Sequence, residues 1–224
     1  MTAQPLSRSV TATRTLARVT GIAGITTLVV VLGGSLANNF QSAPFTSDAG
    51  ATVAFFRTLD DPFGAASSFL TSVGLIALLW FSIGLALLLR PFDGELPWRS
   101  AFLADAGVTA VVSGQIASWD AAVYRSGDID PQVARYAFDL GNLSFANGWV
   151  ATGALAICAG SILITHRSLP TWLGWWAVIA GVGSVLARAV WTEDFAMVPV
   201  AAFWIWTAVL SVWLIRGGLE DRPA

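Results

Sequence analysis

Long apolar segments separated by short polar ones dominate the pattern along this chain. About 20 apolar residues suffice for a helix that crosses the roughly 30 Å hydrocarbon core of a bilayer. We expect such spans at about residues 19–39, 65–89, 100–124, 143–165, 170–190 and 195–215. The pattern predicts an all-α fold, a polytopic integral membrane bundle of six transmembrane helices over residues 19–216. The flanking segments 1–18 and 217–224 are expected to lie in the cytoplasm.

Composition supports a membrane protein and narrows its chemistry. Of 224 residues, 55% are hydrophobic and 12% are charged, against about 25% charged in a soluble domain. The net charge of -2 argues against nucleic acid as a partner. A single cysteine, Cys158, and a single histidine, His166, exclude an intramolecular disulfide and a histidine metal cluster. We expect no cofactor, and we expect membrane lipids as partners.

The arginines predict how the chain is oriented. All twelve basic residues are arginine, and with both termini inside, eight lie on the cytoplasmic side and four outside. Cytoplasmic loops of membrane proteins carry such an excess of positive charge. The Arg-rich, Lys-free composition is also typical of a GC-rich bacterial genome. We therefore predict a multi-pass protein of the bacterial inner (cytoplasmic) membrane with both termini in the cytoplasm.

The first apolar segment has a second interpretation. Arg8, Arg14 and Arg18 precede it, and Ser35-Leu36-Ala37 near its end resembles a secretory cleavage site. Cleavage there would leave five helices without inverting the others. The longer apolar run favours a retained span, and both possibilities stay open.

The outer connections are long enough to form a helical cap. Residues 40–64 are rich in phenylalanine, and residues 125–142 lead into the fourth span. The aromatic residues indicate either anchoring at the membrane interface or a lid over an outward-facing pocket.

Polar residues near the outer ends of spans three to five are the candidate site. Asp130 and Pro131 mark a helix start, and at 100° per residue Arg135, Asp139 and Asn142 share one face with Trp149. Intramembrane polar groups need partners or a wet cavity. The candidate ligand-binding residues are Asp120, Arg135, Asp139, Asn142, Asn147 and Arg188.

Two interpretations of these residues remain. They form either a structural network, in which Arg188 pairs with Asp139 or Asp120, or an outward-facing polar pocket for a small molecule, ion or lipid headgroup. The acids Asp60, Asp61, Asp120, Asp128 and Asp130 could gather oxygens for Ca²⁺, but EF-hand spacing is absent, so we expect no metal site.

A weak internal repeat is visible at an offset of 78 residues. Arg57 and Asp61 precede the second span as Arg135 and Asp139 precede the fourth, and both following spans end in a turn with Leu-Pro. This predicts two parallel copies of a two-helix unit, with a site between them.

Two segments carry a resemblance to a known family. They are Phe138-Asp139-Leu-Gly-Asn142-Leu-Ser-Phe-Ala-Asn147 and Leu169-Pro170-Thr-Trp172-Leu-Gly174-Trp175. The chain resembles small polytopic proteins of actinobacteria and relatives that share domain of unknown function 4386. The resemblance is best over spans four to six, and it implies a helical membrane protein without an assigned activity.

We therefore expect a non-enzymatic membrane protein that binds a ligand at its outer face, in transport, ligand binding or sensing. One alternative is an accessory subunit, either a homo-oligomer or a partner of another membrane protein. A second is a membrane enzyme acting on lipid headgroups, with Asp120 or Asp139 as base.

Overall fold

The computed structural model describes residues 6–33, 48–95, 97–114, 117–166 and 169–217, and all regular elements in these ranges are helices. The long ones are α1 (Leu6–Thr27), α4 (Pro62–Leu89), α5 (Trp98–Gly114), α7 (Pro131–His166), α8 (Thr171–Ala187) and α9 (Met197–Ile215). The short ones are η1 (Leu28–Leu32), α3 (Ala49–Leu59), η2 (Arg90–Phe92), α6 (Ala117–Tyr124), η3 (Arg188–Val190) and η4 (Asp194–Ala196). Within the described ranges, six helices are long and apolar enough to cross a membrane. The predicted all-α, six-span fold is therefore confirmed.

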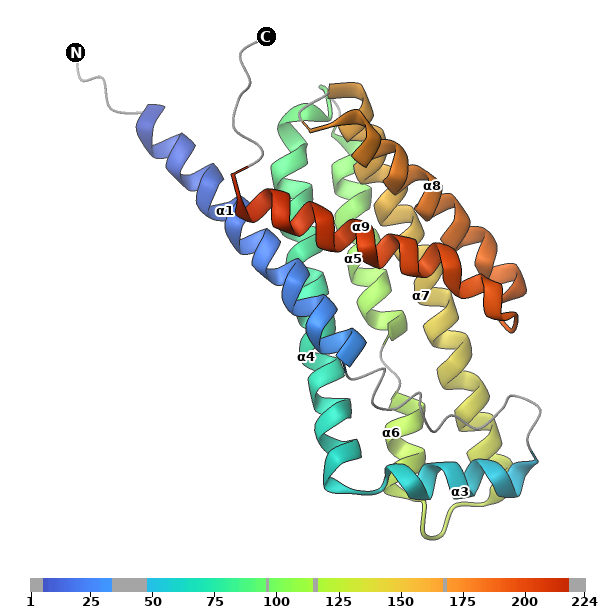
Figure 1. Ribbon diagram of the computed structural model, residues 1–224. Coiled ribbons are helices and arrows are strands. Elements are labelled where there is room, and N and C mark those ends of the chain that lie inside the picture. Colours follow the sequence, from blue (N-terminus) through green and yellow to red (C-terminus); the bar gives the residue numbers. More distant parts are fainter. Residues whose placement is uncertain (1–5, 34–47, 96, 115–116, 167–168, 218–224) are drawn as a thin grey trace.

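The spanning helices form a closed ring. Contacts run in chain order from α1 to α4, α5, α7, α8 and α9, and α9 packs back against α1. α1 begins and α9 ends at the same end of the bundle (Figure 1). This arrangement suits an even number of spans.

Glycines allow the closest approaches in the ring. A Cβ atom on Gly153 would lie 2.6 Å from the carbonyl oxygen of Gly181, and one on Gly160 would lie 2.5 Å from that of Gly174. Small residues at such positions let membrane helices pack backbone to backbone. Four glycines therefore join α7 and α8 along their length.

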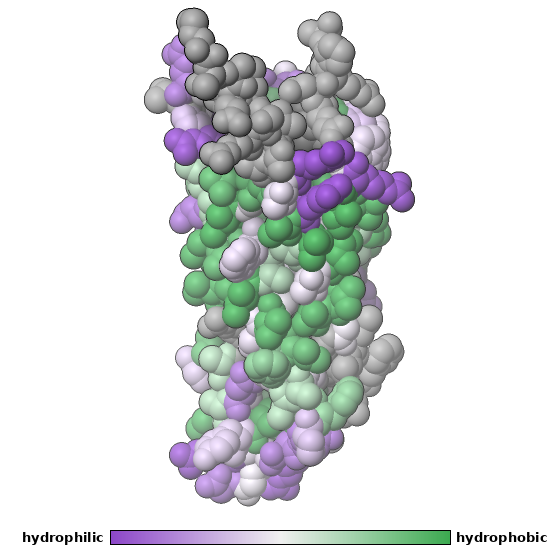
Figure 2. Space-filling view, turned by 90° about the vertical axis from the view of Figure 1, so that its left-hand side faces the viewer, coloured by the Kyte–Doolittle hydropathy of each residue, from purple (hydrophilic) through white to green (hydrophobic). Residues whose placement is uncertain are grey.

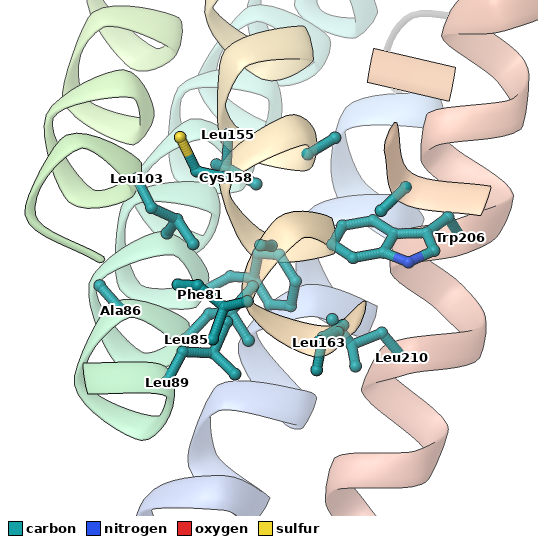
Figure 3. Packing of buried hydrophobic residues seen from close by; sticks show 14 of the residues in the cluster. Phe81, Leu85, Ala86, Leu89, Leu103, Leu155, Cys158, Leu163, Trp206 and Leu210 are labelled. Carbon is teal, nitrogen blue, oxygen red and sulfur yellow. The ribbon is translucent and has the colours of Figure 1, made fainter. Parts of the chain in front are cut away.

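The centre of the ring is filled with apolar side chains. Phe81 of α4, Leu103 of α5, Leu155 of α7 and Trp206 of α9 are almost fully buried in one cluster (Figure 3). The indole nitrogen of Trp206 donates a hydrogen bond to the carbonyl oxygen of Leu173 at 3.0 Å. A packed centre argues against a hydrated pathway through the ring.

Exposed apolar side chains cover the outside of the ring. Figure 2 shows a broad hydrophobic band between hydrophilic residues at both ends of one face. On α4 the exposed residues follow one stripe, opposite the buried face: Ile76, Trp80, Ile83 and Leu87. An uncovered band of this kind fits contact with lipid tails.

Part of the molecule continues beyond the ring. α7 has 36 residues, a length of about 54 Å at 1.5 Å per residue, which exceeds the bilayer core of about 30 Å. Its first half, α6 and the start of α4 project past the ends of α1 and α8, and α3 lies across them (Figure 1). We call residues 48–73 and 117–146 the extension. It contains the described part of the predicted helical cap, residues 48–64 and 125–142, and is larger than expected, while residues 40–47 lie outside the described ranges.

The helix starts in the extension follow the sequence signals. Asp130 accepts hydrogen bonds from the backbone N–H groups of Gln132 and Val133 at 2.8 and 3.3 Å, directly before Pro131. Asp61 accepts one from Gly64 at 2.6 Å. Both carboxylates satisfy N–H groups that a helix start leaves unpaired.

One expected boundary lies elsewhere in the structure, and parts of two other expectations lie outside the described residues. α1 begins at Leu6, within the segment expected as a tail. Span three is described as α5 and α6, and residues 115–116 between them lie outside the described ranges, as does the candidate cleavage site at 35–37.

The two halves of the proposed repeat differ locally. Arg57 lies in the last turn of α3 and Asp61 caps α4, whereas Arg135 and Asp139 lie within α7. After the two spans, α5 and α8 both start directly after a proline, Pro97 and Pro170.

Candidate functional site

The six predicted site residues are spread along the extension and its junction with the ring. Asp120 lies on α6, four of the others lie on α7, and Arg188 begins η3. Asp120 and Arg135 are exposed, and Asp139 and Asn142 are half-buried. Among the described residues, most of them have separate hydrogen-bond partners.

Arg188 has an amide as its partner. Its Nε atom donates a hydrogen bond to Oδ1 of Asn147 at 2.7 Å. This joins the end of α8 to α7 at the level where the ring meets the extension. The expected pairing of Arg188 with Asp139 or Asp120 differs from this geometry, because Asn147 lies nearer to the end of α8.

Asn142 bonds to its own helix. Its Nδ2 atom donates to the carbonyl oxygen of Phe138 at 2.8 Å, and Nε1 of Trp119 donates to the same oxygen at 3.2 Å. Trp119 stacks on the Phe138 ring, with centroids 5.4 Å apart. A Cβ atom on Gly141 would lie 2.2 Å from the Trp119 ring, so this glycine makes room for the indole.

The face of α7 that carries Arg135, Asp139, Asn142 and Trp149 packs against protein where it reaches the ring. Trp149 is 6% exposed and lies in a cluster with Ala187, Ala196 and Val200. Gly153 contacts α8. The C-terminal part of this face, with Trp149 and Gly153, therefore contacts protein, and its N-terminal part, with Arg135, Asp139 and Asn142, lies in the extension.

The acidic residues that were considered for Ca²⁺ are individually engaged. Asp120 accepts a hydrogen bond from Ser68 at 2.7 Å, Asp60 accepts one from Ser126 at 2.8 Å, and Asp128 pairs with Arg125 at 4.0 Å. Asp61 and Asp130 cap helices. Across the described ranges, no three His, Cys, Asp or Glu residues are grouped to hold a metal ion.

A groove lies between α6 and α7 on another face of the extension. Its volume is about 390 Å³, and it is open to the outside. Ala121 and Ala122 line it from α6, and Ala137 and Leu140 line it from α7. The remaining lining residues are Ser118, Arg125, Asp128, Ile129, Val133 and Tyr136.

The groove combines an apolar wall with a charged mouth. Arg125 and Asp128 stand where α6 ends, their side chains 67% and 76% exposed. The Arg125 guanidinium also lies 5.9 Å from the ring centroid of the exposed Tyr124. One cation and one anion therefore flank the mouth of a mainly apolar groove.

The sequence contains a signal for one wall of this groove, on a different face of α7 from the polar residues Arg135 and Asp139. Val133, Tyr136, Ala137 and Leu140 follow the i, i+3, i+4, i+7 spacing of one apolar helix face. At 100° per residue this face points away from Arg135 and Asp139. The wall supplied by α6 has no comparable signal, because small alanines there mark a groove only once α7 is in place.

A second polar cluster, at the opposite end of the molecule, was also missed. The Asp93 side chain is fully buried, accepts from Nε of Arg99 at 2.5 Å and from the backbone N–H of Ser100 at 2.7 Å. Burial raises the pKa of Asp93, but the hydrogen bonds from Ser100 and the Arg99 guanidinium outweigh burial and hold it below its usual value. Both oxygens have partners, so this cluster fixes the turn between α4 and α5.

Sequence comparison identifies the family. The profile of a family described as Domain of unknown function (DUF4386) matches residues 22–218. The chain belongs to this family. The match confirms the resemblance inferred from the segments around Asp139 and Pro170, and it covers the last part of α1 and the other five spanning helices. No curated protein and no solved structure matches the chain.

Proposed function

We propose that this DUF4386 protein is a non-enzymatic membrane protein that binds an amphiphile in the α6–α7 groove. The apolar chain of the amphiphile lies against α6 and α7, and its polar end meets Arg125 and Asp128. The observation that carries the proposal is the groove itself, with its apolar walls and a charged pair at one end.

Size and surroundings support this function. A volume of about 390 Å³ falls in the range of about 300–1,000 Å³ that small-molecule sites occupy. Val133, Tyr136 and Leu140 line the groove and are exposed, and tyrosine favours the membrane interface. An amphiphile can therefore enter sideways from the surrounding lipid.

The charges at the mouth favour a zwitterionic headgroup. Arg125 matches a phosphate and Asp128 an ammonium group, since hydrogen bonds between oppositely charged groups are stronger than those between neutral ones. The walls of the groove are mainly apolar, whereas a catalytic site would place an acid and a base beside the substrate. This composition supports binding over catalysis. The packed centre of the ring likewise favours binding over transport through the bundle.

The test is binding of lysophosphatidylcholine, a zwitterionic single-chain probe, to protein held in amphipol. Native mass spectrometry should detect one saturable adduct. Ala121→Phe fills the groove from an exposed position and should weaken binding at least 10-fold. Ala201→Phe adds the same ring to an exposed position on α9 and is the matched control.

Equal binding by the two phenylalanine variants, or adduct numbers that rise without saturation, would contradict the proposal. Arg125→Gln combined with Asp128→Asn should weaken lysophosphatidylcholine more than a single-chain alcohol of the same length. This comparison separates the headgroup contact from the contact with the chain.

A further inference from the structure

We propose that amphiphile binding in the groove and docking of α3 on the extension are coupled, so that a bound amphiphile holds α3 in place. This inference rests on the proposed function, because it concerns regulation of the same site. It derives from two structural links between the groove and α3.

The first link is a set of side chains that lie between the groove and α3 and belong to both. Ala122, Ile129 and Ala137 line the groove and also belong to the apolar cluster beneath α3. On the α3 side, Phe55 and Phe56 pack edge-on against Trp119, with ring centroids 5.4 and 6.0 Å away. Alanine side chains cannot absorb a displacement by changing rotamer, so a shift of α6 against α7 reaches the two phenylalanines directly.

The second link is the turn between α6 and α7. Ser126, which is 1% exposed, accepts a hydrogen bond from Nε of Arg57 at 3.0 Å through its carbonyl oxygen. Its hydroxyl donates to Asp60 at 2.8 Å. Two bonds thus tie the end of α3 to Ser126, which lies between Arg125 and Asp128 at the groove mouth.

Both links require the same relative position of α6 and α7. An amphiphile that contacts both helices favours that position, and α3 docks on it from the other side. Coupling between two binding events is reciprocal. If docking of α3 strengthens amphiphile binding by a given factor, a bound amphiphile raises the docking equilibrium constant of α3 by the same factor.

Hydrogen exchange measures the coupling in the unaltered protein. Amphipol-held protein is saturated with lysophosphatidylcholine, and exchange of the α3 backbone amides 53–59 is followed by mass spectrometry. We expect exchange of α3 to slow at least 5-fold on binding, because docked α3 is stabilised. Amides of α9, far from the groove, should exchange unchanged.

The converse experiment weakens the attachment of α3. Arg57→Ala with Asp60→Ala removes both bonds to Ser126 without touching a groove residue, and we expect affinity for lysophosphatidylcholine to fall at least 5-fold. Thr58→Ala is the matched control, since the Thr58 hydroxyl bonds only to Phe55 of the same helix among the described residues. The milder Asp60→Asn variant should give a smaller fall in the same direction.

The outcomes separate the two proposals. Saturable binding with unchanged α3 exchange, or with equal affinity in the Arg57–Asp60 double variant and the Thr58 variant, would overturn the coupling and leave the proposed function standing. Absence of saturable binding in the unaltered protein would overturn both.

Discussion

Buried hydroxyl groups of the ring bond mostly to their own helices. Thr152, Ser184 and Thr207 each donate to the carbonyl oxygen four residues earlier, at 2.9 to 3.0 Å. Asn142 does the same with its amide. Such bonds satisfy a polar side chain in an apolar setting without a second helix or a ligand.

This local bonding supplies partners for polar residues of α7 that the sequence pattern does not identify. From sequence, a polar residue on a membrane helix indicates a partner or a cavity. Asn142 has its partner within one turn, and Asn147 has its partner in Arg188. Which neighbour satisfies an amide depends on where the next helix ends, and the pattern along the chain does not contain that information.

At Asp93 we predict a pH-dependent contribution to stability. Its pKa is held below the ordinary value of 3.8, so the ionised side chain stabilises the fold above about pH 4, and the benefit is lost as pH falls through the lowered value. Asp93→Ala should cost about 3 kcal/mol at pH 7, because Arg99 and Ser100 lose a buried partner. Thermal unfolding at pH 7 and pH 3 should show the difference shrinking at low pH.

The control for Asp93 lies in the following helix. Asp105 is exposed, so Asp105→Ala should change stability by less than about 0.5 kcal/mol. A destabilisation by Asp93→Ala that stays constant between pH 7 and pH 3 would contradict an ionised buried carboxylate.

Among the elements, the pairing of α7 with α8 depends on glycine. We predict that Gly160→Ala destabilises the protein by about 2 kcal/mol, since the new Cβ would collide with the Gly174 carbonyl oxygen. Gly148→Ala is the control on the same helix, because the nearest atom to its Cβ lies 3.7 Å away. It should be neutral or stabilising by up to about 1 kcal/mol through helix propensity.

Thermal unfolding of the two variants in one detergent checks this prediction. Equal melting temperatures for Gly160→Ala and Gly148→Ala would mean that α8 moves away from α7 without cost.

The sequence predicted most of the helices, whereas it predicted the residues at which they begin and end less accurately. Asp130 and Pro131 marked the start of α7 correctly, because capping and a fixed proline φ act locally. The start of α1 at Leu6 was not expected, since the apolar pattern begins near residue 19. The groove required two elements at once, and pairing between helices is set by packing shape.

For the whole molecule, the extension identifies one end of the bundle. We predict from the arginine distribution that this end faces away from the cytoplasm. On a Cys158→Ala background, Gly127→Cys in the extension should react with an impermeant maleimide in intact cells. Glu95→Cys, in the turn between α4 and α5, should react only after the membrane is opened.

Both positions are exposed, so each cysteine is accessible once the reagent reaches its side. Labelling of Glu95→Cys, but not Gly127→Cys, in intact cells would reverse the predicted topology.

The closed ring has a consequence for biosynthesis. α1 completes its packing only against α9, where a Cβ on Gly21 or Gly24 would collide with Ser211. Translation delivers α4 to α8 between these two partners. A face of α1 that is shaped for close contact therefore stays open to lipid until α9 is inserted. Ribosome-bound chains that stop before α9 should be the form of this protein most exposed to membrane quality control.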